Sequence, residues 1–256
     1  MGSVLKILMI GLCVLMFSII GISSVYAADD EYITIGTRYF NITFDKLHGG
    51  VVTSLQYKGV EFLTGPKEGV WGTIGLRRSI WDGIGDVCTR WPIDMYYQYD
   101  QNHTVTVSEN DMEYVVTIRP NGTSRVLGED GEIVWTIPKD LAVITVRYVP
   151  GYDNEYLYIP FIRDYNLSMG ILTYYTVDGR RIIATPTPYC ESRWYRSYLA
   201  QYELLREGLS VRAMILVHDF PFSYYSAYYG ADPKTWQLHY PFDGVKPKEI
   251  SMLFYD

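Results

Sequence analysis

Residues 142–148 read AVITVRY, and this stretch is the clearest indication of the fold class. Its side chains alternate with a two-residue period, which recurs over residues 103–107 (HTVTV) and 114–118 (YVVTI). Successive side chains of a strand point to opposite faces, so each run predicts a strand with one face in a core. The sequence also holds 25 Tyr, and Tyr, Thr, Val and Ile suit a pleated, half-buried surface.

Turn signals separate these runs at short intervals. They are Gly49-Gly50, Lys58-Gly59, Asn121-Gly122, Asp130-Gly131, Asp178-Gly179, Glu207-Gly208 and Asp243-Gly244. Short strands with turns this frequent predict an all-β, antiparallel two-sheet sandwich or a barrel, rather than βαβ units. No repeat, linker or low-complexity tract is visible, so residues 28–256 are predicted to form a single domain.

Two hairpins are predicted from local sequence. The first has strands at 170–177 and 180–184 around Asp178-Gly179, and the second has strands at 194–205 and 209–218. The first arm of the second hairpin also fits a helical spacing, although its alternating Tyr and Trp favour a strand. By contrast, residues 71–99 combine several Gly with Pro, aromatic and charged residues, which predicts an irregular connection.

The N-terminal residues 1–27 have the order of a secretory signal. Lys6 precedes an apolar run over 7–22, and Val25 and Ala27 provide small residues for cleavage after Ala27. The rest of the chain is therefore expected outside the cell or at its surface. The alternative is an uncleaved membrane anchor, because a span needs about 20 apolar residues.

Four glycosylation sequons agree with this location. Their asparagines are Asn41, Asn102, Asn121 and Asn166. The alternative is chance, because the pattern is short and Asn and Thr are common at turns. If the sites are used, each Asn must lie on exposed backbone.

The chain is acidic, with a formal net charge of −7, and loss of residues 1–27 removes one Lys and no acid. This balance argues against a nucleic-acid partner and disfavours an anionic membrane surface. A membrane partner is expected only through the N-terminal segment, if it is uncleaved. No cofactor is predicted.

Two cysteines lie outside the N-terminal segment, Cys88 and Cys190. In an oxidising compartment they are expected to form one disulfide, and the alternative is two buried free thiols. Neither belongs to a CxxC pair, and no two of the four His share a metal-ligand spacing, so no metal site is predicted.

A family resemblance lies over roughly residues 39–65. Residues 39–44 (YFNITF), 45–55 (DKLHGGVVTSL) and 56–63 (QYKGVEFL) resemble the N-terminal strands of galactose mutarotase-like domains. The resemblance implies a twisted two-sheet supersandwich that binds carbohydrate, in a superfamily with sugar epimerases, polysaccharide lyases and sandwich domains of glycosidases. The Asn/Arg motif, two His and late Glu of true mutarotases have no counterpart here, so mutarotase activity is not implied.

The candidate sugar site lies in the connection over 71–99. The ligand-binding candidates are Arg78, Trp81, Arg90 and Trp91, and the candidate acid and base are Asp82 and Asp86. Flat aromatic faces suit the C–H side of a sugar ring, and Asp and Arg pair with hydroxyls. The alternative is a structural brace, with core tryptophans and ordinary ion pairs.

A second cluster contains Glu191 and Arg193, next to Cys190. A disulfide to Cys88 would place Glu191 beside Asp86, giving the carboxylate pair that glycoside hydrolysis requires. The sequence thus favours a carbohydrate-recognising domain. A polysaccharide lyase or hydrolase and a non-catalytic structural protein of the cell surface are the alternatives.

Overall fold

The computed structural model describes residues 25–66, 72–80, 93–96, 102–122, 128–151, 155–185, 192–218, 224–228, 235–239 and 248–256. Almost all regular structure in these ranges is strand, and every strand pairing is antiparallel. Within them, no helix is both long and apolar enough to cross a membrane.

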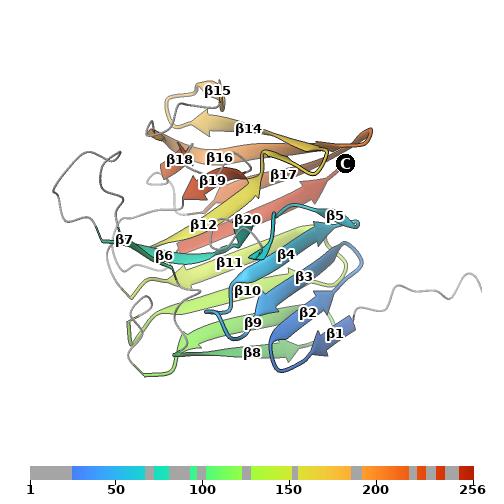
Figure 1. Cartoon of the computed structure of the whole chain (residues 1–256), viewed down its shortest axis with the longest axis vertical. Coiled ribbons are helices and arrows are strands. Elements are labelled where there is room, and N and C mark those ends of the chain that lie inside the picture. The colour runs from blue at the N-terminus through green and yellow to red at the C-terminus, as the bar shows by residue number, and fades with distance from the viewer. Residues whose placement is uncertain are drawn as a thin grey trace, which may run out of the picture.

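The N-terminal strands form a five-stranded sheet in sequence order, visible in blue in Figure 1. Its strands are β1 (Val25–Ala28), β2 (Tyr32–Gly36), β3 (Phe40–Asp45), β4 (Val52–Tyr57) and β5 (Val60–Glu61). A four-stranded sheet continues this layer, in the order β19 (Thr235–His239), β12 (Glu155–Ile162), β6 (Gly75–Ile80) and β7 (Ile93–Tyr96). The Val52–Ile74 bridge joins the two sheets through N–H···O bonds of 2.9 and 3.0 Å.

The second layer is one large sheet behind the first. Its order is β13 (Asp164–Tyr165), β14 (Ser168–Thr176), β16 (Ser192–Arg206), β17 (Leu209–Val217), β20 (Lys248–Tyr255), β11 (Val143–Val149), β10 (Glu132–Pro138), β9 (Glu113–Pro120) and β8 (His103–Glu109). Two shorter strands pair at its side, β15 (Arg181–Ile183) with β14 and β18 (Tyr224–Tyr228) with β16. The predicted antiparallel sandwich is confirmed.

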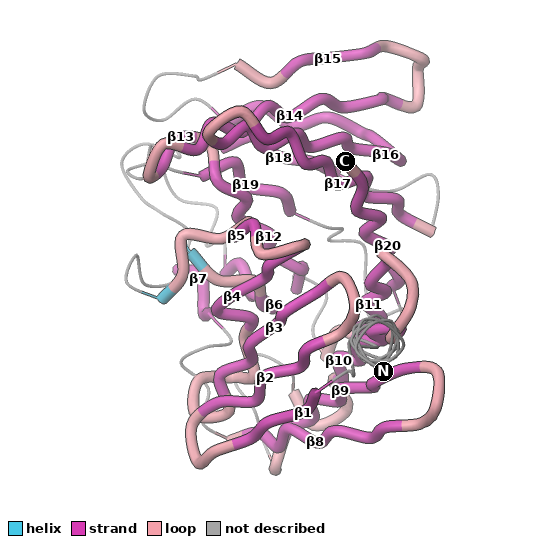
Figure 2. The backbone as a smooth tube through the Cα atoms, turned by 90° about the vertical axis from the view of Figure 1, so that its right-hand side faces the viewer, coloured by secondary structure: helices cyan, strands magenta, loops and turns pink. Residues whose placement is uncertain are grey.

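The core lies between the two layers, which Figure 2 shows from the side. Phe44 of β3 meets Trp135 of β10 edge-on, with ring centroids 5.6 Å apart. Phe254 of β20 meets Phe40 and Phe62 of the other layer, each at 5.1 Å. These pairs hold the layers together because each ring is withdrawn from water on folding.

The alternation in the sequence sets which face of each strand is buried. In β11 the side chains of Ile144, Val146 and Tyr148 are fully buried, whereas Arg147 is exposed and Val143 is half-buried. Both predicted hairpins are confirmed as well. β14 pairs with β15, and β16 pairs with β17 from Leu199↔Leu216 to Arg206↔Leu209, so the helical alternative for residues 194–205 is wrong.

The prediction of an irregular connection over 71–99 is wrong in part. β6 and β7 lie inside it and pair from Arg77↔Tyr96 to Ile80↔Ile93. β6 also pairs with β12, which is distant in the sequence. The glycines in this stretch predicted a loop. Pairing with β12 stabilises a strand there nevertheless, and this distant partner leaves no mark in the local sequence.

A bulge divides β16 into two parts. The register with β14 shifts so that Tyr175 faces Leu199 and Thr176 faces Ser197, leaving Tyr198 as an extra residue. The Ser197 hydroxyl lies 2.6 Å from the carbonyl oxygen of Tyr175 and 2.8 Å from that of Leu199. Beyond the bulge, residues 192–196 pair with β18 instead of β17, so β16 links the large sheet to a second group of strands.

Candidate functional site

Most of the predicted sugar site lies outside the described residues. This applies to Trp81, Asp82, Asp86, Arg90, Trp91 and Glu191, and to the predicted disulfide partners Cys88 and Cys190. The backbone positions of Arg78 and Arg193 are described: Arg78 is on β6 and Arg193 is on β16.

The strands that carry Arg78 and Arg193 reach the same end of the molecule. Arg78 is the register partner of Glu155 in β12, and Arg193 is the partner of Ala227 in β18. β18 lies against β19, which in turn pairs with β12, and these strands share the left side of Figure 1. Three strands, β12, β19 and β18, thus lie between β6 and β16 along this series of contacts. The two strands therefore flank one end of the sandwich without being neighbours.

All four sequon asparagines lie at exposed positions. Asn41 is on β3, Asn102 precedes β8, Asn121 follows β9, and Asn166 is in the turn between β13 and β14. Exposed backbone is the condition that glycosylation requires. Whether any site is glycosylated stays a prediction.

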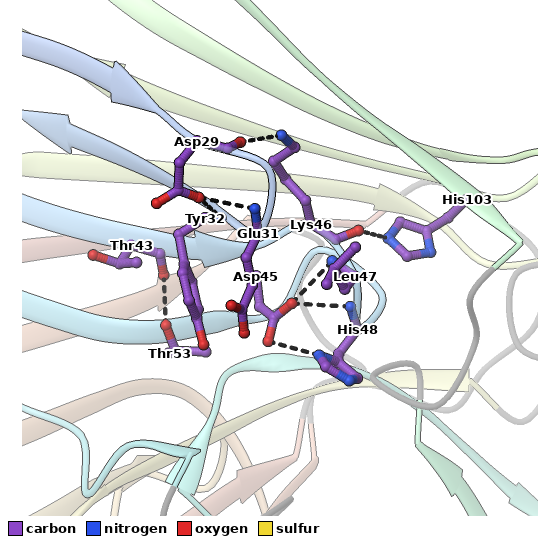
Figure 3. Close-up of polar contacts among 10 residues, drawn as sticks. All are labelled: Asp29, Glu31, Tyr32, Thr43, Asp45, Lys46, Leu47, His48, Thr53 and His103. Atoms are coloured by element: carbon purple, nitrogen blue, oxygen red, sulfur yellow. Dashed lines mark hydrogen bonds and ion pairs between the residues drawn. The ribbon is translucent and has the colours of Figure 1, made fainter.

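The turn between β3 and β4 contains a dense polar cluster, shown in Figure 3. The Asp45 side chain is buried, and its Oδ1 accepts from the backbone N–H groups of Leu47 (2.9 Å) and His48 (3.0 Å). Its Oδ2 lies 2.8 Å from His48 Nδ1. His103 Nε2 lies 2.8 Å from the carbonyl oxygen of Lys46 and ties β8 to the turn. All of these bonds of the Asp45 carboxylate go to groups of its own turn, so the cluster stabilises the turn and is structural.

Tyr32 stands beside this turn in Figure 3. A hydrogen bond to the Glu31 carboxylate, with desolvation and the negative charges of Glu31, Asp45 and Asp29, raises the pKa of Tyr32 to about 12. The hydroxyl therefore keeps its proton near neutral pH and is a poor general base.

A small cavity of about 290 Å³ lies at the end of β9 and β10. It is lined by Arg119, Pro120, Glu129, Asp130, Gly131, Glu132 and Val149. Arg119 Nε donates to Glu132 Oε1 at 2.6 Å, so its charge is already partnered within the cavity wall. Most of these residues are charged or polar, whereas a small-molecule pocket is typically lined by apolar side chains.

The outer face of the large sheet carries a different polar group, formed by His218, Ser251, Glu249 and Thr145. His218 follows β17 and donates its backbone N–H to the carbonyl oxygen of Glu249 at 3.0 Å. Its Nε2 lies 2.9 Å from Ser251 Oγ, and its Nδ1 lies 3.4 Å from Glu249 Oε1. Ser251 Oγ is also 3.1 Å from Thr145 Oγ1. No local sequence pattern points to this group, because Glu249 and Ser251 lie on a strand about 30 residues beyond His218.

The described residues contain no cluster of three or more His, Cys, Asp or Glu side chains that could hold a metal ion. The polar groups around Asp45 and around His218 offer hydrogen bonding and proton transfer.

We compared the sequence and the structure with those of known proteins. No protein-family model matches the sequence, and no curated protein matches it. Solved structures do match, and they show that the chain has the galactose mutarotase-like sandwich fold. The resemblance seen in residues 39–65 is thereby confirmed at the level of fold.

Particular structures illustrate the match. A galactose mutarotase-like protein from Lactobacillus casei aligns at 10% identity with a TM-score of 0.51, over 91% of this chain and 100% of that chain. An α-N-acetylgalactosaminidase from Bifidobacterium bifidum, in complex with GalNAc, aligns at 11% identity with a TM-score of 0.56. There the match covers 87% of this chain but 36% of that chain, so the same fold also occurs as one part of a longer protein.

Proposed function

We propose that this chain is a carbohydrate-recognising β-sandwich domain that acts outside the cytoplasm, in the medium or at the cell surface. The observation that carries the proposal is the fold, which matches a galactose mutarotase-like protein along that protein's whole length. A solved neighbour named as an α-N-acetylgalactosaminidase, with GalNAc bound, supports a sugar as the ligand class. The exposed positions of the four sequon asparagines support the location.

We place the binding site at the end of the sandwich that β6 and β7 flank on one side and β18 and β19 on the other. The strands at this end carry Arg78 and Arg193, and the segment between β6 and β7 carries the candidate tryptophans Trp81 and Trp91. A stacking ring and a guanidinium group supply the two contacts that a saccharide needs, an apolar face and donors for hydroxyl oxygens.

Glycan-array binding tests this site. Arg78→Ala, Trp81→Ala, Trp91→Ala and Arg193→Ala are compared with Arg181→Ala, which removes an exposed arginine from β15 at another part of the sheet. Binding should fall by about two- to tenfold for at least one tryptophan variant, with unchanged thermal unfolding, because stacking on an aromatic ring contributes about 0.5–1.5 kcal/mol. Arg181→Ala should bind as the unaltered chain does.

Catalysis is the second question at the same site. Release of reducing sugar from a polysaccharide panel, abolished by Asp82→Asn, Asp86→Asn or Glu191→Gln, would make the chain a glycoside hydrolase rather than a binding domain. Absence of both binding and release across the panels would contradict the proposal and favour a structural protein of the cell surface. For the location, expression in a glycosylating host followed by enzymatic deglycosylation and peptide mapping should show modified sequon asparagines.

A further inference from the structure

We propose that the outer face of the large sheet carries a hydrolytic site, in which Ser251, His218 and Glu249 act on carboxylic esters. This site is independent of the proposed carbohydrate site, because it lies on β20 and just after β17 and shares none of its residues. The proposal rests on the geometry of three side chains that sequence reasoning did not connect.

The three side chains have the order that nucleophilic catalysis requires. Ser251 Oγ lies 2.9 Å from His218 Nε2, within hydrogen-bond reach of a base. The other ring nitrogen, Nδ1, faces Glu249 Oε1 at 3.4 Å, an electrostatic contact longer than an ordinary hydrogen bond. The mechanism requires the tautomer with the proton on Nδ1, toward Glu249, and a lone pair on Nε2, toward Ser251. A nucleophile, a base and an orienting acid on one surface form the constellation that recurs on unrelated folds.

Strand register explains why these residues meet. Leu216 faces Ser251 and Val217 faces Ile250, so the next residue, His218, faces Glu249. Side chains two apart on a strand share a face, which places Glu249 and Ser251 together on β20. The flanking residues Ile250 and Met252 are fully buried, so the strand that carries the site is anchored in the core.

The neighbours of Ser251 suit an ester with a short acyl chain. On the β11 side, Thr145 Oγ1 lies 3.1 Å from Ser251 Oγ and can donate to an oxygen that becomes negative beside it. Leu216, directly opposite Ser251, is 42% exposed, and Leu253, two residues along β20, is 46% exposed. These two side chains offer an apolar surface to the acyl group.

The reaction proceeds by acyl transfer. Ser251 Oγ attacks the ester carbonyl carbon while its proton passes to His218 Nε2, and the tetrahedral oxyanion forms near the Thr145 hydroxyl. The C–O bond to the alcohol then breaks, and the leaving oxygen takes the proton from His218. Water then attacks the carbonyl carbon of the acyl-serine while His218 Nε2 takes one of its protons. The bond between that carbon and Ser251 Oγ breaks, His218 returns the proton to Ser251 Oγ, and the carboxylic acid leaves.

The rate should be modest for two structural reasons. The side chains of His218 and Glu249 are 41% and 40% exposed, so water is not excluded from the site. The described residues supply one hydroxyl donor for the oxyanion, and loss of one donor of a pair costs roughly 100- to 1,000-fold in kcat.

The test uses the purified chain with 4-nitrophenyl acetate and butyrate, together with a fluorophosphonate probe that labels activated serines. Ser251→Ala and His218→Gln should each lower hydrolysis by about tenfold or more, and Glu249→Gln by a smaller factor, because base and nucleophile act as a unit. Peptide mapping should find the probe on Ser251.

Two matched controls separate this site from surface reactivity. Ser108 is an exposed strand serine on β8, and His48 is another exposed histidine beside a carboxylate. Ser108→Ala and His48→Gln should leave hydrolysis unchanged, and Ser108 should not be labelled. Hydrolysis that survives His218→Gln, or equal labelling of Ser251 and Ser108, would overturn the proposal, since the group would then be only a cross-strand polar contact.

Discussion

At Gly170 the backbone of β14 passes closer to its neighbours than a β-carbon permits. A Cβ built there would lie 1.9 Å from the carbonyl oxygen of Ile162 and 2.7 Å from the ring of Tyr202. The same contact region contains two buried hydrogen bonds, from Tyr202 Oη to Ile162 O (2.6 Å) and from Trp236 Nε1 to Gly170 O (2.9 Å). Only glycine therefore fits at position 170, because any β-carbon would overlap these neighbours.

Gly170→Ala should therefore destabilise the protein by about 3 kcal/mol or more, because the obstacle is backbone rather than a movable side chain. Gly59→Ala is the matched control. Gly59 has open space around it, and its φ of +80° alone should cost about 1 kcal/mol. Urea unfolding of both variants measures the difference, and equal losses would contradict the steric account.

Tyr202 should make the stability sensitive to alkaline pH. Complete burial raises the pKa of its phenol well above the usual value of about 10. Above about pH 10 the unfolded chain releases this proton and the folded chain keeps it, so the free energy of unfolding falls as pH rises.

Tyr202→Phe should make that decline shallower above about pH 10, although the variant loses about 1 kcal/mol near neutral pH with its hydrogen bond to Ile162. Tyr198→Phe, which removes a hydroxyl at an exposed position on the same strand, is the matched control. Chemical unfolding at a series of pH values provides the slopes. Parallel curves for Tyr202→Phe and the unaltered chain would rule out this role.

At the scale of single elements, the sequence predicted best the strand pairs that are close together along the chain. The hairpins β14–β15 and β16–β17 were found because each has its turn and both arms within a short stretch. The β6–β7 pair was missed because its support comes from β12, about 80 residues further on. The outer-face group of Ser251, His218 and Glu249 was missed for the same reason, since no local pattern brings residues 218 and 251 together.

Strand β1 bears on the predicted maturation of the chain. Its residues pair with β2 from Val25↔Gly36 to Ala28↔Ile33, and the predicted cleavage point after Ala27 lies inside it. A peptidase needs an extended, unpaired substrate, so cleavage should precede this pairing, and the mature chain should begin at Ala28 with β2 as the sheet edge.

Secretion from a suitable host, followed by N-terminal sequencing and mass measurement of the medium, tests this. A chain that keeps residues 1–27 and fractionates with membranes would instead establish the uncleaved anchor. Ala27→Arg, which removes the small residue at the cleavage point, is the control that should block processing.

At the scale of the whole molecule, the contact between Phe44 and Trp135 links the two layers. Both side chains are buried, and their rings meet edge-on at 5.6 Å. Trp135→Ala should cost about 3–5 kcal/mol, because it leaves a large cavity between the sheets. Val134→Ala, on the outer face of the same strand, should cost about 1 kcal/mol.

A double-mutant cycle with Phe44→Ala sharpens this prediction. The combined loss should fall short of the sum of the single losses by about 0.5–1.5 kcal/mol, because the rings contact each other. Strict additivity in calorimetry or urea unfolding would show that the two sides of the core are not coupled through this pair.

The sandwich as a class could be predicted because alternation marks a buried and an exposed face on each strand, as residues 142–148 do. The order of strands in the sheets could not, because antiparallel pairing leaves little trace in single strands. The position of β20 shows this well. It is the last strand of the described chain, yet it lies between β11 and β17 in the middle of the large sheet.

That position has a consequence for biosynthesis. Between the end of β11 at Val149 and the start of β20 at Lys248, about 100 residues must leave the ribosome, which takes roughly 5–20 s at ordinary translation speeds. During this interval the inner edge of β11 has no partner, and the same holds for β17 once residues 209–217 have been made. An unpaired edge is a template for pairing with another nascent chain. The two halves of the large sheet can join only when β20 has been made. We therefore expect the emerging polypeptide to need chaperones during this interval, and a stop codon before residue 248 should give aggregates rather than a smaller folded protein.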